Sequence, residues 1–227
     1  MIEAVIFDVD GTLVDSVDDH AKAWRETMKK YGKDIAFDDV RAQIGKGGDQ
    51  LMPVFFSKGE LDDFGEKMEK ERGELFQSKY LPHIKPFPKV RELFERIQAD
   101  GKKIALASSA NEKELEHFKE LLNIKDLLEA DTNAGDAETS KPEPDIFLAA
   151  MKQLGDPKPE ETIVIGDTPY DRIAATKAGV DTICFLSGGF PEEQLRGCIA
   201  IFKDPADLLA RYNESPLAAV SKKGAAK

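Results

Sequence analysis

The sequence predicts an α/β fold in which a parallel-sheet core is interrupted by an inserted all-α segment. Short apolar runs rich in β-branched residues occur at 4–7, 103–107 and 162–166, and helical patterns separate them. Such runs are typical of strands buried on both faces of a parallel sheet and connected by helices. By contrast, residues 16–85 show only helical patterns, so this stretch is expected to form a separate unit.

The change of pattern predicts how the chain is divided. Residues 1–15 and 86–213 are expected to form a Rossmann-like core, and residues 16–85 a helical cap domain, called the cap below. A cluster of prolines around residue 85 marks the far end of the insertion. Residues 214–227 are rich in Ala, Lys and Ser, and we expect them to be a flexible tail.

Size and charge exclude several classes of function. The chain has 227 residues and a net charge of −11, which argues against binding to nucleic acid or to anionic membranes. No stretch approaches the roughly 20 apolar residues of a membrane span. We therefore expect a cytoplasmic protein whose partner is a small molecule; the sequence does not indicate its oligomeric state.

The two cysteines lie in apolar, strand-like runs near the end of the chain. Cys184 follows Thr182 and Ile183, and Cys198 precedes Ile199 and Ala200. Buried free thiols are expected at such positions, and neither a disulfide nor a metal site is indicated.

The first strand-like run, Ala4–Phe7, ends in two carboxylates. Residues two apart in an extended chain point the same way, so Asp8 and Asp10 face one volume at the carboxyl edge of the sheet. Two bare carboxylates there would repel, so either one holds a proton or a hard cation such as Mg²⁺ lies between them. A simple turn made by Asp10 and Gly11 explains neither the apolar strand nor the second carboxylate.

The run from Asp8 to Ser16, Asp-Val-Asp-Gly-Thr-Leu-Val-Asp-Ser, resembles the first motif of the haloacid dehalogenase superfamily. Most members of that superfamily are Mg²⁺-dependent phosphatases. The resemblance implies that Asp8 is the nucleophile that forms an aspartyl-phosphate, and that Asp10 is the general acid and then the general base. Thr12 lies in the same motif and is a candidate substrate-binding residue.

The cap is expected to begin with a helix over 17–31 that Gly32 ends. His20 and Trp24 lie four residues apart and share one face of it. Trp24 is explained by packing in the core of the cap or at its seam with the rest of the chain, and His20 as a surface or packed histidine. The alternative for His20 is substrate binding, because β-phosphoglucomutase and related phosphatases have a histidine near the active-site entrance at this point.

A short helix over 37–44 is followed by the glycine-rich loop 45–50, which opens a helix to about residue 56. Such a loop is either a flexible turn or an anion site made by N–H groups at a helix start. The resemblance implies that the loop faces the active site, which makes Lys46 a candidate substrate contact. A long helix over 60–81 follows, whose apolar stripe packs against other helices.

The core pattern resumes with a helix over 88–100 and a strand over 103–107. The strand ends in Ser108, Ser109 and Asn111, just before a helix over 112–122. These side chains either cap that helix or bind phosphate beside its exposed N–H groups, and both can hold together. Ser108 matches the second motif of the superfamily.

Lys141 stands just before a predicted helix start, and the prolines on both sides of Glu143 restrict the backbone there. A loop lysine is normally solvated. The segment resembles the third motif, which implies that Lys141 neutralises both the nucleophile and the phosphoryl group.

The strand over 162–166 delivers Asp167, with Asp171 four residues further on. Asp167 is either a helix cap or, by resemblance to the fourth motif, part of a Mg²⁺ site. The resemblance implies that Asp8, Asp167 and the backbone carbonyl of Asp10 hold the ion. Asp171 is then either a further ligand or a residue that contacts a ligand without binding the ion itself. Strand-like runs at 180–186 and 198–202 and a helix over 205–212 are expected to close the core.

The prediction that follows is a Mg²⁺-dependent phosphatase acting on a small phosphorylated metabolite, closest to the phosphoglycolate phosphatase and β-phosphoglucomutase group. Asp10 argues against a haloacid dehalogenase and a phosphonoacetaldehyde hydrolase, because those relatives lack it. A phosphosugar mutase is the alternative, but Gly47 and Gly48 stand where mutases place an arginine. A non-catalytic binding protein on the same scaffold would be expected to have lost Asp8, Asp10 or Asp167.

Overall fold

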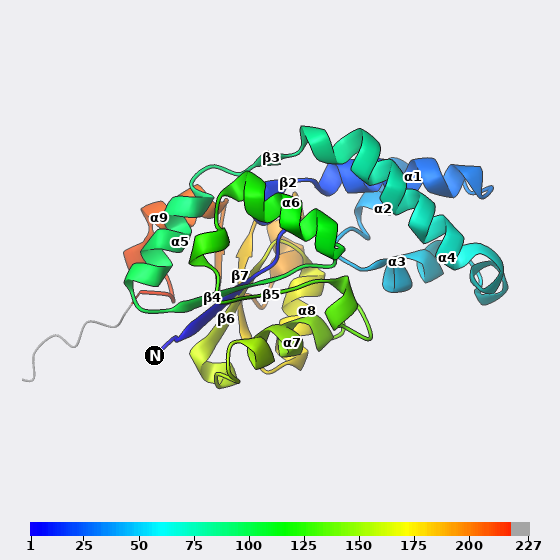
Figure 1. Ribbon diagram of the computed structural model, residues 1–227. Helices are drawn as coiled ribbons and strands as arrows, with labels where there is room; N and C mark the ends of the chain where they lie inside the picture. The colour runs from blue at the N-terminus through cyan, green and yellow to red at the C-terminus, as the bar shows by residue number, and fades with distance from the viewer. Residues whose placement is uncertain (219–227) are drawn as a thin grey trace, which may run out of the picture.

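The core is a six-stranded parallel sheet with the strand order β5-β4-β1-β6-β7-β8, seen in a computed structural model that describes residues 1–218 (Figure 1). The strands are β1 (Ala4–Phe7), β4 (Lys103–Ala107), β5 (Ala130–Thr132), β6 (Thr162–Gly166), β7 (Asp181–Phe185) and β8 (Ala200–Phe202). All six run the same way, so their carboxyl ends share one edge. The predicted α/β fold is confirmed; of the six strands, only β5 was not predicted.

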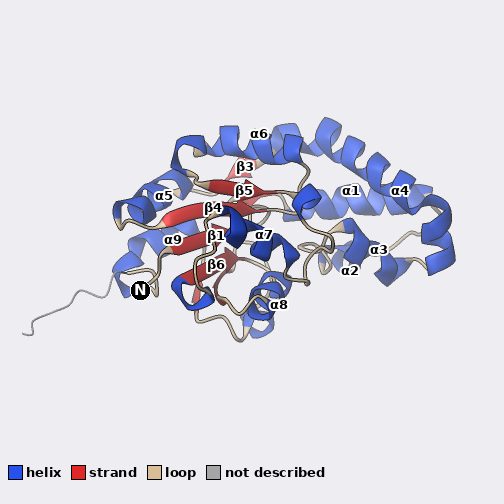
Figure 2. Ribbon diagram, turned by 60° about the horizontal axis from the view of Figure 1, so that its bottom comes forward, coloured by secondary structure: helices blue, strands red, loops and turns tan. Residues whose placement is uncertain are grey.

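Helices cover both faces of this sheet (Figure 2). The core helices are α5 (Val90–Ala99), α6 (Glu112–Leu122), α7 (Asp145–Gln153), α8 (Pro169–Lys177) and α9 (Pro205–Ala210). Successive side chains of β1 point to opposite faces of the sheet. Val5 and Phe7 pack in the hydrophobic cluster with α5, α6 and α9. Ala4 and Ile6 pack in the cluster with α7 and α8. In the described part of the chain, no helix is both long and apolar enough to cross a membrane.

Residues between 17 and 68 form their own hydrophobic cluster, as a separate cap would require, whereas Phe76, Tyr80, Leu81 and Ile84 pack into the main cluster of the core. The division into a core and a cap at residues 16–85 stays a proposal. The helices of the cap are α1 (Val17–Lys30), α2 (Phe37–Arg41), α3 (Gly48–Phe55) and α4 (Lys58–Leu75). Ser57 and Glu60 form a reciprocal capping box, so α4 begins two residues earlier than expected. A π-helical turn, Phe76–Tyr80, continues α4, and the short antiparallel strands β2 (Val14–Asp15) and β3 (Lys85–Pro86) join the cap to the core.

The chain stays packed beyond residue 213. Leu217 is fully buried in the main core cluster together with Tyr212, which differs from the expected flexible tail. An apolar residue in an Ala-, Lys- and Ser-rich stretch has no periodicity around it, so no sequence pattern predicts this contact. The rest of the expected tail, 219–227, lies outside the described residues.

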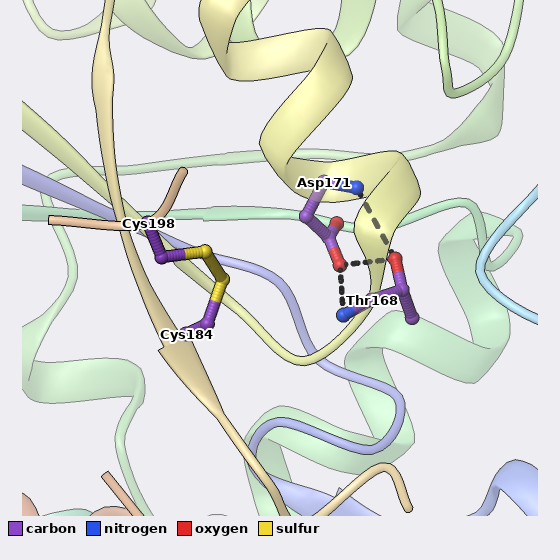
Figure 3. Close-up of a disulfide and its surroundings, with 4 residues drawn as sticks. All are labelled: Thr168, Asp171, Cys184 and Cys198. Carbon is purple, nitrogen blue, oxygen red and sulfur yellow. Dashed lines mark hydrogen bonds between the residues drawn. A yellow bond between two sulfur atoms is a disulfide. The ribbon is translucent and has the colours of Figure 1, made fainter. Parts of the chain in front are cut away.

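The expectation of free thiols is wrong, because Cys184 and Cys198 form a disulfide (Figure 3). Their Cα atoms are 5.9 Å apart, within the usual range for a disulfide. The bond lies in a small apolar cluster with Phe190 and Leu195. The pairing arises because β8 lies beside β7, so that the segment before β8 returns to the end of β7; spacing along the chain does not reveal this.

Reduction of this disulfide is expected to lower the free energy of unfolding by about 2–4 kcal/mol, because the bond restricts the unfolded chain. Urea unfolding with and without a dithiol reductant measures the change. The matched control is the double variant Cys184→Ala/Cys198→Ala, whose unfolding midpoint should not respond to the reductant. Equal midpoints for the oxidised and reduced wild type would contradict a stabilising role.

Candidate active site

Side chains from three separate segments meet at the carboxyl edge of the sheet. Asp8 and Asp10 follow β1, Asp167 follows β6, and Lys141 comes from the loop before α7. The strands place these residues together because β1 lies at the middle of the sheet, between β4 and β6. The separate motifs of the sequence therefore form one site.

Lys141 is the centre of a buried charge cluster. Its Nζ lies 2.5 Å from Oδ1 of Asp8 and 2.8 Å from Oδ1 of Asp171, and it donates to the carbonyl of Ala107 at 3.3 Å. Its side chain is only 1% exposed, so these charges have little contact with water. Asp171 is held in turn by Thr168, whose backbone N–H and hydroxyl donate to its Oδ2 at 3.0 and 2.6 Å (Figure 3).

Three buried carboxylates offer a place for a divalent cation. Ligand oxygens of Asp8, Asp167 and Asp171 lie within 4.8 Å of one another. The hydroxyl of Thr12 donates to Oδ1 of Asp167 at 2.7 Å, whereas Oδ2 of Asp167 is buried and accepts no hydrogen bond from any described residue. Carboxylate oxygens are the ligands that Mg²⁺ prefers, so this unpartnered oxygen suits the ion.

The protonation of the carboxylates reflects this crowding. Burial raises the pKa of Asp8, Lys141 lowers it in part, and Asp171 and Asp10 raise it again, with a result of about 7. Burial also raises the pKa of Asp167, and the charges of Asp8 and Asp171 add to the rise. A cation among these oxygens would favour the ionised carboxylates and so oppose both shifts.

Asp10 has a different environment from Asp8. Its Oδ1 accepts hydrogen bonds from Ser16 Oγ at 2.5 Å and from His20 Nε2 at 2.9 Å. Burial acts to raise the pKa of Asp10, but the attraction and hydrogen bond of His20 and the hydrogen bond of Ser16 outweigh it and lower the pKa. His20 stacks on Phe76 with ring centres 3.8 Å apart, and Nη1 of Arg72 faces its Nδ1 at 3.5 Å.

A pocket of about 90 Å³ opens between the core and the cap. Asp8 and Asp10 line it from the core together with Ser109, while His20 and Lys46 line it from the cap. Five of the predicted site residues therefore face one cavity. A cavity of this size has room for a small chemical group and none for a macromolecule.

Four other predicted residues lie near this pocket without lining it. Oγ of Ser108 is buried and accepts the N–H of Ala110 at 3.0 Å. Asn111 caps α6 by accepting the N–H of Glu114 at 3.0 Å. Thr12 and Lys141 lie behind Asp8, within hydrogen-bonding distance of its carboxylate. Binding of substrate by Ser108 and Asn111 remains a prediction.

Arg72 lines the pocket but is not among the residues that the sequence predicts for the site. Its guanidinium carbon lies over the ring of Trp24, 4.8 Å from the ring centre. Charged residues on a long, charged helix look like a solvated face. One signal was present: Arg72 lies four residues after Met68 and four before Phe76, both of which are fully buried. Its position is therefore on the buried stripe of the helix.

Comparison with known proteins agrees with the motifs. A phosphoglycolate phosphatase of Aquifex aeolicus is 29% identical over 192 residues, covering 82% of this chain and 86% of that protein. A phosphorylated carbohydrates phosphatase of Thermotoga maritima is 29% identical over 182 residues, covering 80% and 84%. The crystal structure of a hydrolase from Pseudomonas syringae, 27% identical, superposes with a TM-score of 0.85 over 96% of this chain and 100% of that one.

The family relationship extends over most of the chain. A sequence model described as haloacid dehalogenase-like hydrolase matches residues 5–185, which include the cap and all four motif segments. The resemblance of the first motif is thus confirmed, and the chain belongs to the haloacid dehalogenase-like hydrolase family.

Proposed function

We propose that the protein is a Mg²⁺-dependent phosphatase that hydrolyses a small phosphate monoester through an aspartyl-phosphate on Asp8. The observation that carries the proposal is the different setting of the two carboxylates at the pocket floor. Asp8 lies against Lys141 and forms an acidic cluster with Asp167 and Asp171, whereas Asp10 lies with Ser16 and His20. Two carboxylates in such unlike surroundings suit two different roles.

The proposed ligands of Mg²⁺ are Asp8, Asp167 and the backbone carbonyl of Asp10. Asp171 is placed behind them because its Oδ1 forms an ion pair with Lys141 and its Oδ2 accepts a hydrogen bond from Thr168. The unpartnered oxygen of Asp167 supports this assignment. When bound, the ion would offset the negative charge of the nucleophile and of the phosphoryl oxygens.

In the first half of the proposed reaction, a carboxylate oxygen of Asp8 attacks phosphorus and the bond from phosphorus to the ester oxygen breaks. Asp10 gives its proton to the departing alkoxide. The negative charge of a bound phosphate raises the pKa of Asp10, which prepares it to carry that proton. Lys141 holds Asp8 in place and faces the phosphoryl group, with Ser108 and Ser109 nearby.

In the second half, Asp10 accepts a proton from the attacking water, whose oxygen bonds to phosphorus. The bond between Asp8 and phosphorus breaks, which releases inorganic phosphate and restores the carboxylate. Asp10 is protonated again and the cycle closes. His20 and Lys46 would contact the leaving group, since both line the pocket on the cap side.

A phosphosugar mutase is the second candidate. Lys46 and Arg72 bring two cations to the cap side of the pocket, and a second phosphate could bind between them. A mutase must return the phosphoryl group of Asp8 to the sugar rather than to water. A non-catalytic binding protein is disfavoured because the pocket still contains Asp8 and Asp10.

The test is phosphate release across a panel of phosphomonoesters that includes phosphoglycolate, hexose phosphates and nucleotides, each with Mg²⁺ and with a chelator. The expected result is release of phosphate from at least one of these compounds with Mg²⁺ and no release with the chelator. Interconversion of hexose phosphate isomers without release would favour the mutase. No reaction on any member, with Mg²⁺ bound, would overturn the proposal.

The stabilisation that Mg²⁺ gives is expected to grow between about pH 5 and about pH 8. Without metal, the raised pKa of Asp8, about 7, lets the folded chain bind a proton that the unfolded chain has lost, so this contribution to stability falls as pH rises. Bound Mg²⁺ keeps the carboxylate ionised and removes that fall. Melting temperatures with Mg²⁺ and with chelator measure the difference, and an equal gain at both ends of the range would contradict the assignment.

We also propose a cytoplasmic location, with a small phosphorylated metabolite as the partner and no nucleic acid or membrane, as the net charge of −11 favours. Cytoplasmic thiols are mostly kept reduced, so this location predicts that the disulfide between Cys184 and Cys198 is reduced to two thiols in growing cells, although the fold places the pair to close it. Alkylation of free thiols before lysis measures their state. A fully oxidised pair would contradict the cytoplasmic location.

A further inference from the structure

The loop that follows β7 reaches back to the acidic cluster. Its turn is closed by a hydrogen bond from the N–H of Gly189 to the carbonyl of Leu186 at 2.9 Å. Oγ of Ser187 donates to the carbonyl of Gly11 at 2.6 Å, which ties the loop to the turn after Asp10. The loop is therefore fixed to the same edge of the sheet as the nucleophile.

Gly188 and Gly189 in this loop lie against the carboxylate of Asp167 and the guanidinium of Arg41, respectively. A Cβ atom at Gly188 would overlap the carboxylate of Asp167, at the oxygen that has no hydrogen-bond partner. A Cβ atom at Gly189 would overlap the guanidinium of Arg41, and the φ of Gly189 is +76°, which favours glycine. Only backbone therefore lies between Asp167 and Arg41.

Arg41 connects this loop to the cap. It is the last residue of α2, and its Nε donates to Oδ1 of Asp18 on α1 at 2.7 Å. Its Nη2 donates to the carbonyl of Gly188 at 2.9 Å. The guanidinium is thus anchored within the cap while it holds the backbone that packs on Asp167.

We infer that Arg41 is a positioning residue that couples the placement of the cap to the metal-binding carboxylate of Asp167. With the cap closed, the bond from Arg41 holds Gly188 against Asp167 and limits the orientations of its free oxygen. When the cap moves away, that bond is lost and the carboxylate gains freedom, which weakens metal binding. By linkage, bound metal favours the closed cap to the same extent. The inference rests on the proposed function, because it assumes that Asp167 binds Mg²⁺.

The structure supplies a matched control. Tyr170 of α8 donates its hydroxyl to the carbonyl of Ala42 at 2.7 Å, which is a second core-to-cap hydrogen bond next to Arg41. This bond does not involve the loop that packs on Asp167. Tyr170→Phe therefore removes a bond that holds the cap and leaves the contact between Arg41 and Gly188 in place.

The experiment is calorimetric titration of Mg²⁺ into the wild type, Arg41→Ala and Tyr170→Phe, with the Mg²⁺ dependence of phosphate release as a second measurement. Arg41→Ala is expected to bind Mg²⁺ about tenfold more weakly. Tyr170→Phe loosens the cap but keeps the bond from Arg41 to Gly188, so it is expected to weaken Mg²⁺ binding clearly less, by about twofold, while its KM for substrate rises. The side chain of Arg41 is 25% exposed, so its replacement is expected to leave the fold intact.

Three results would count against the inference in different ways. Wild-type Mg²⁺ affinity in Arg41→Ala would overturn it while leaving the proposed function standing. Equal weakening in both variants would also overturn it, because loss of any core-to-cap bond would then have the same effect as loss of Arg41. A wild type that binds no Mg²⁺ would overturn the proposed function itself, and the inference with it.

Discussion

Asp8→Asn is expected to lower kcat about 10⁴-fold or more while the free energy of unfolding stays within about 1 kcal/mol of the wild type. An amide oxygen is a far weaker nucleophile than a carboxylate, so no phosphoryl-enzyme forms. The fold should persist because asparagine has the shape of aspartate and Lys141 keeps its ion pair with Asp171 at 2.8 Å. Loss of one negative charge also reduces repulsion with Asp167.

Phosphate release on the best substrate of the panel and urea unfolding measure the two quantities. Asp181→Asn is the matched control, because Asp181 is an exposed carboxylate at the start of β7, at the opposite end of the sheet. That variant should keep wild-type activity. Turnover by Asp8→Asn above a thousandth of the wild-type rate, about 10⁻³, would contradict the assignment of Asp8 as nucleophile.

The core of the fold could be predicted because its signals are local. A short apolar run flanked by polar residues predicts a buried strand, and a carboxylate after such a run must lie at the carboxyl edge. Asp8 and Asp167 follow β1 and β6, which are adjacent strands, so their meeting follows from the strand order. The prediction that both carboxylates reach one volume therefore needed only the pattern and the rule for parallel sheets.

Other parts of the site depend on contacts that no local pattern encodes. Arg41 and Gly188 are 147 residues apart and meet only because the cap lies over the loop after β7. Ser187, Gly188 and Gly189 look like an ordinary turn in the sequence, and the disulfide depends on β8 lying beside β7. Arg72 could be predicted only in part. Its helical spacing from the buried Met68 indicates a buried position, whereas its charge indicates a position in solvent.

The roles of Asp171 and Asp10 show how packing refines a motif. The sequence left open whether Asp171 is a ligand or stands behind one, and its bonds to Lys141 and Thr168 favour the second. Asp10 lies outside the group of three carboxylates, which agrees with a metal contact through its backbone only. Both distinctions depend on which side chain already has a partner, and spacing alone does not give that.

Lys141→Met is expected to reduce the free energy of unfolding by about 3–5 kcal/mol at neutral pH without Mg²⁺. The reason is that Asp8 and Asp171 would remain buried beside Asp167 with no cation to offset them. Loss of the lysine is also expected to lower kcat about 10³-fold, because in the proposed mechanism Lys141 holds the nucleophile and faces the phosphate.

Two causes of this destabilisation, uncompensated buried charge and loss of packing, can be distinguished by experiment. If uncompensated charge is the cause, the loss should shrink near pH 5, where Asp8 takes up a proton, and should shrink again when Mg²⁺ replaces the missing cation. Lys102→Met is the matched control: Lys102 is 3% exposed and lies 3.4 Å from Asp100, away from the acidic cluster. Mg²⁺ should change the free energy of unfolding of Lys102→Met by the same amount as that of the wild type. A Lys141→Met protein that is equally unstable at both pH values, with and without Mg²⁺, would show that the lysine contributes packing alone, and the charge cluster would then need another explanation.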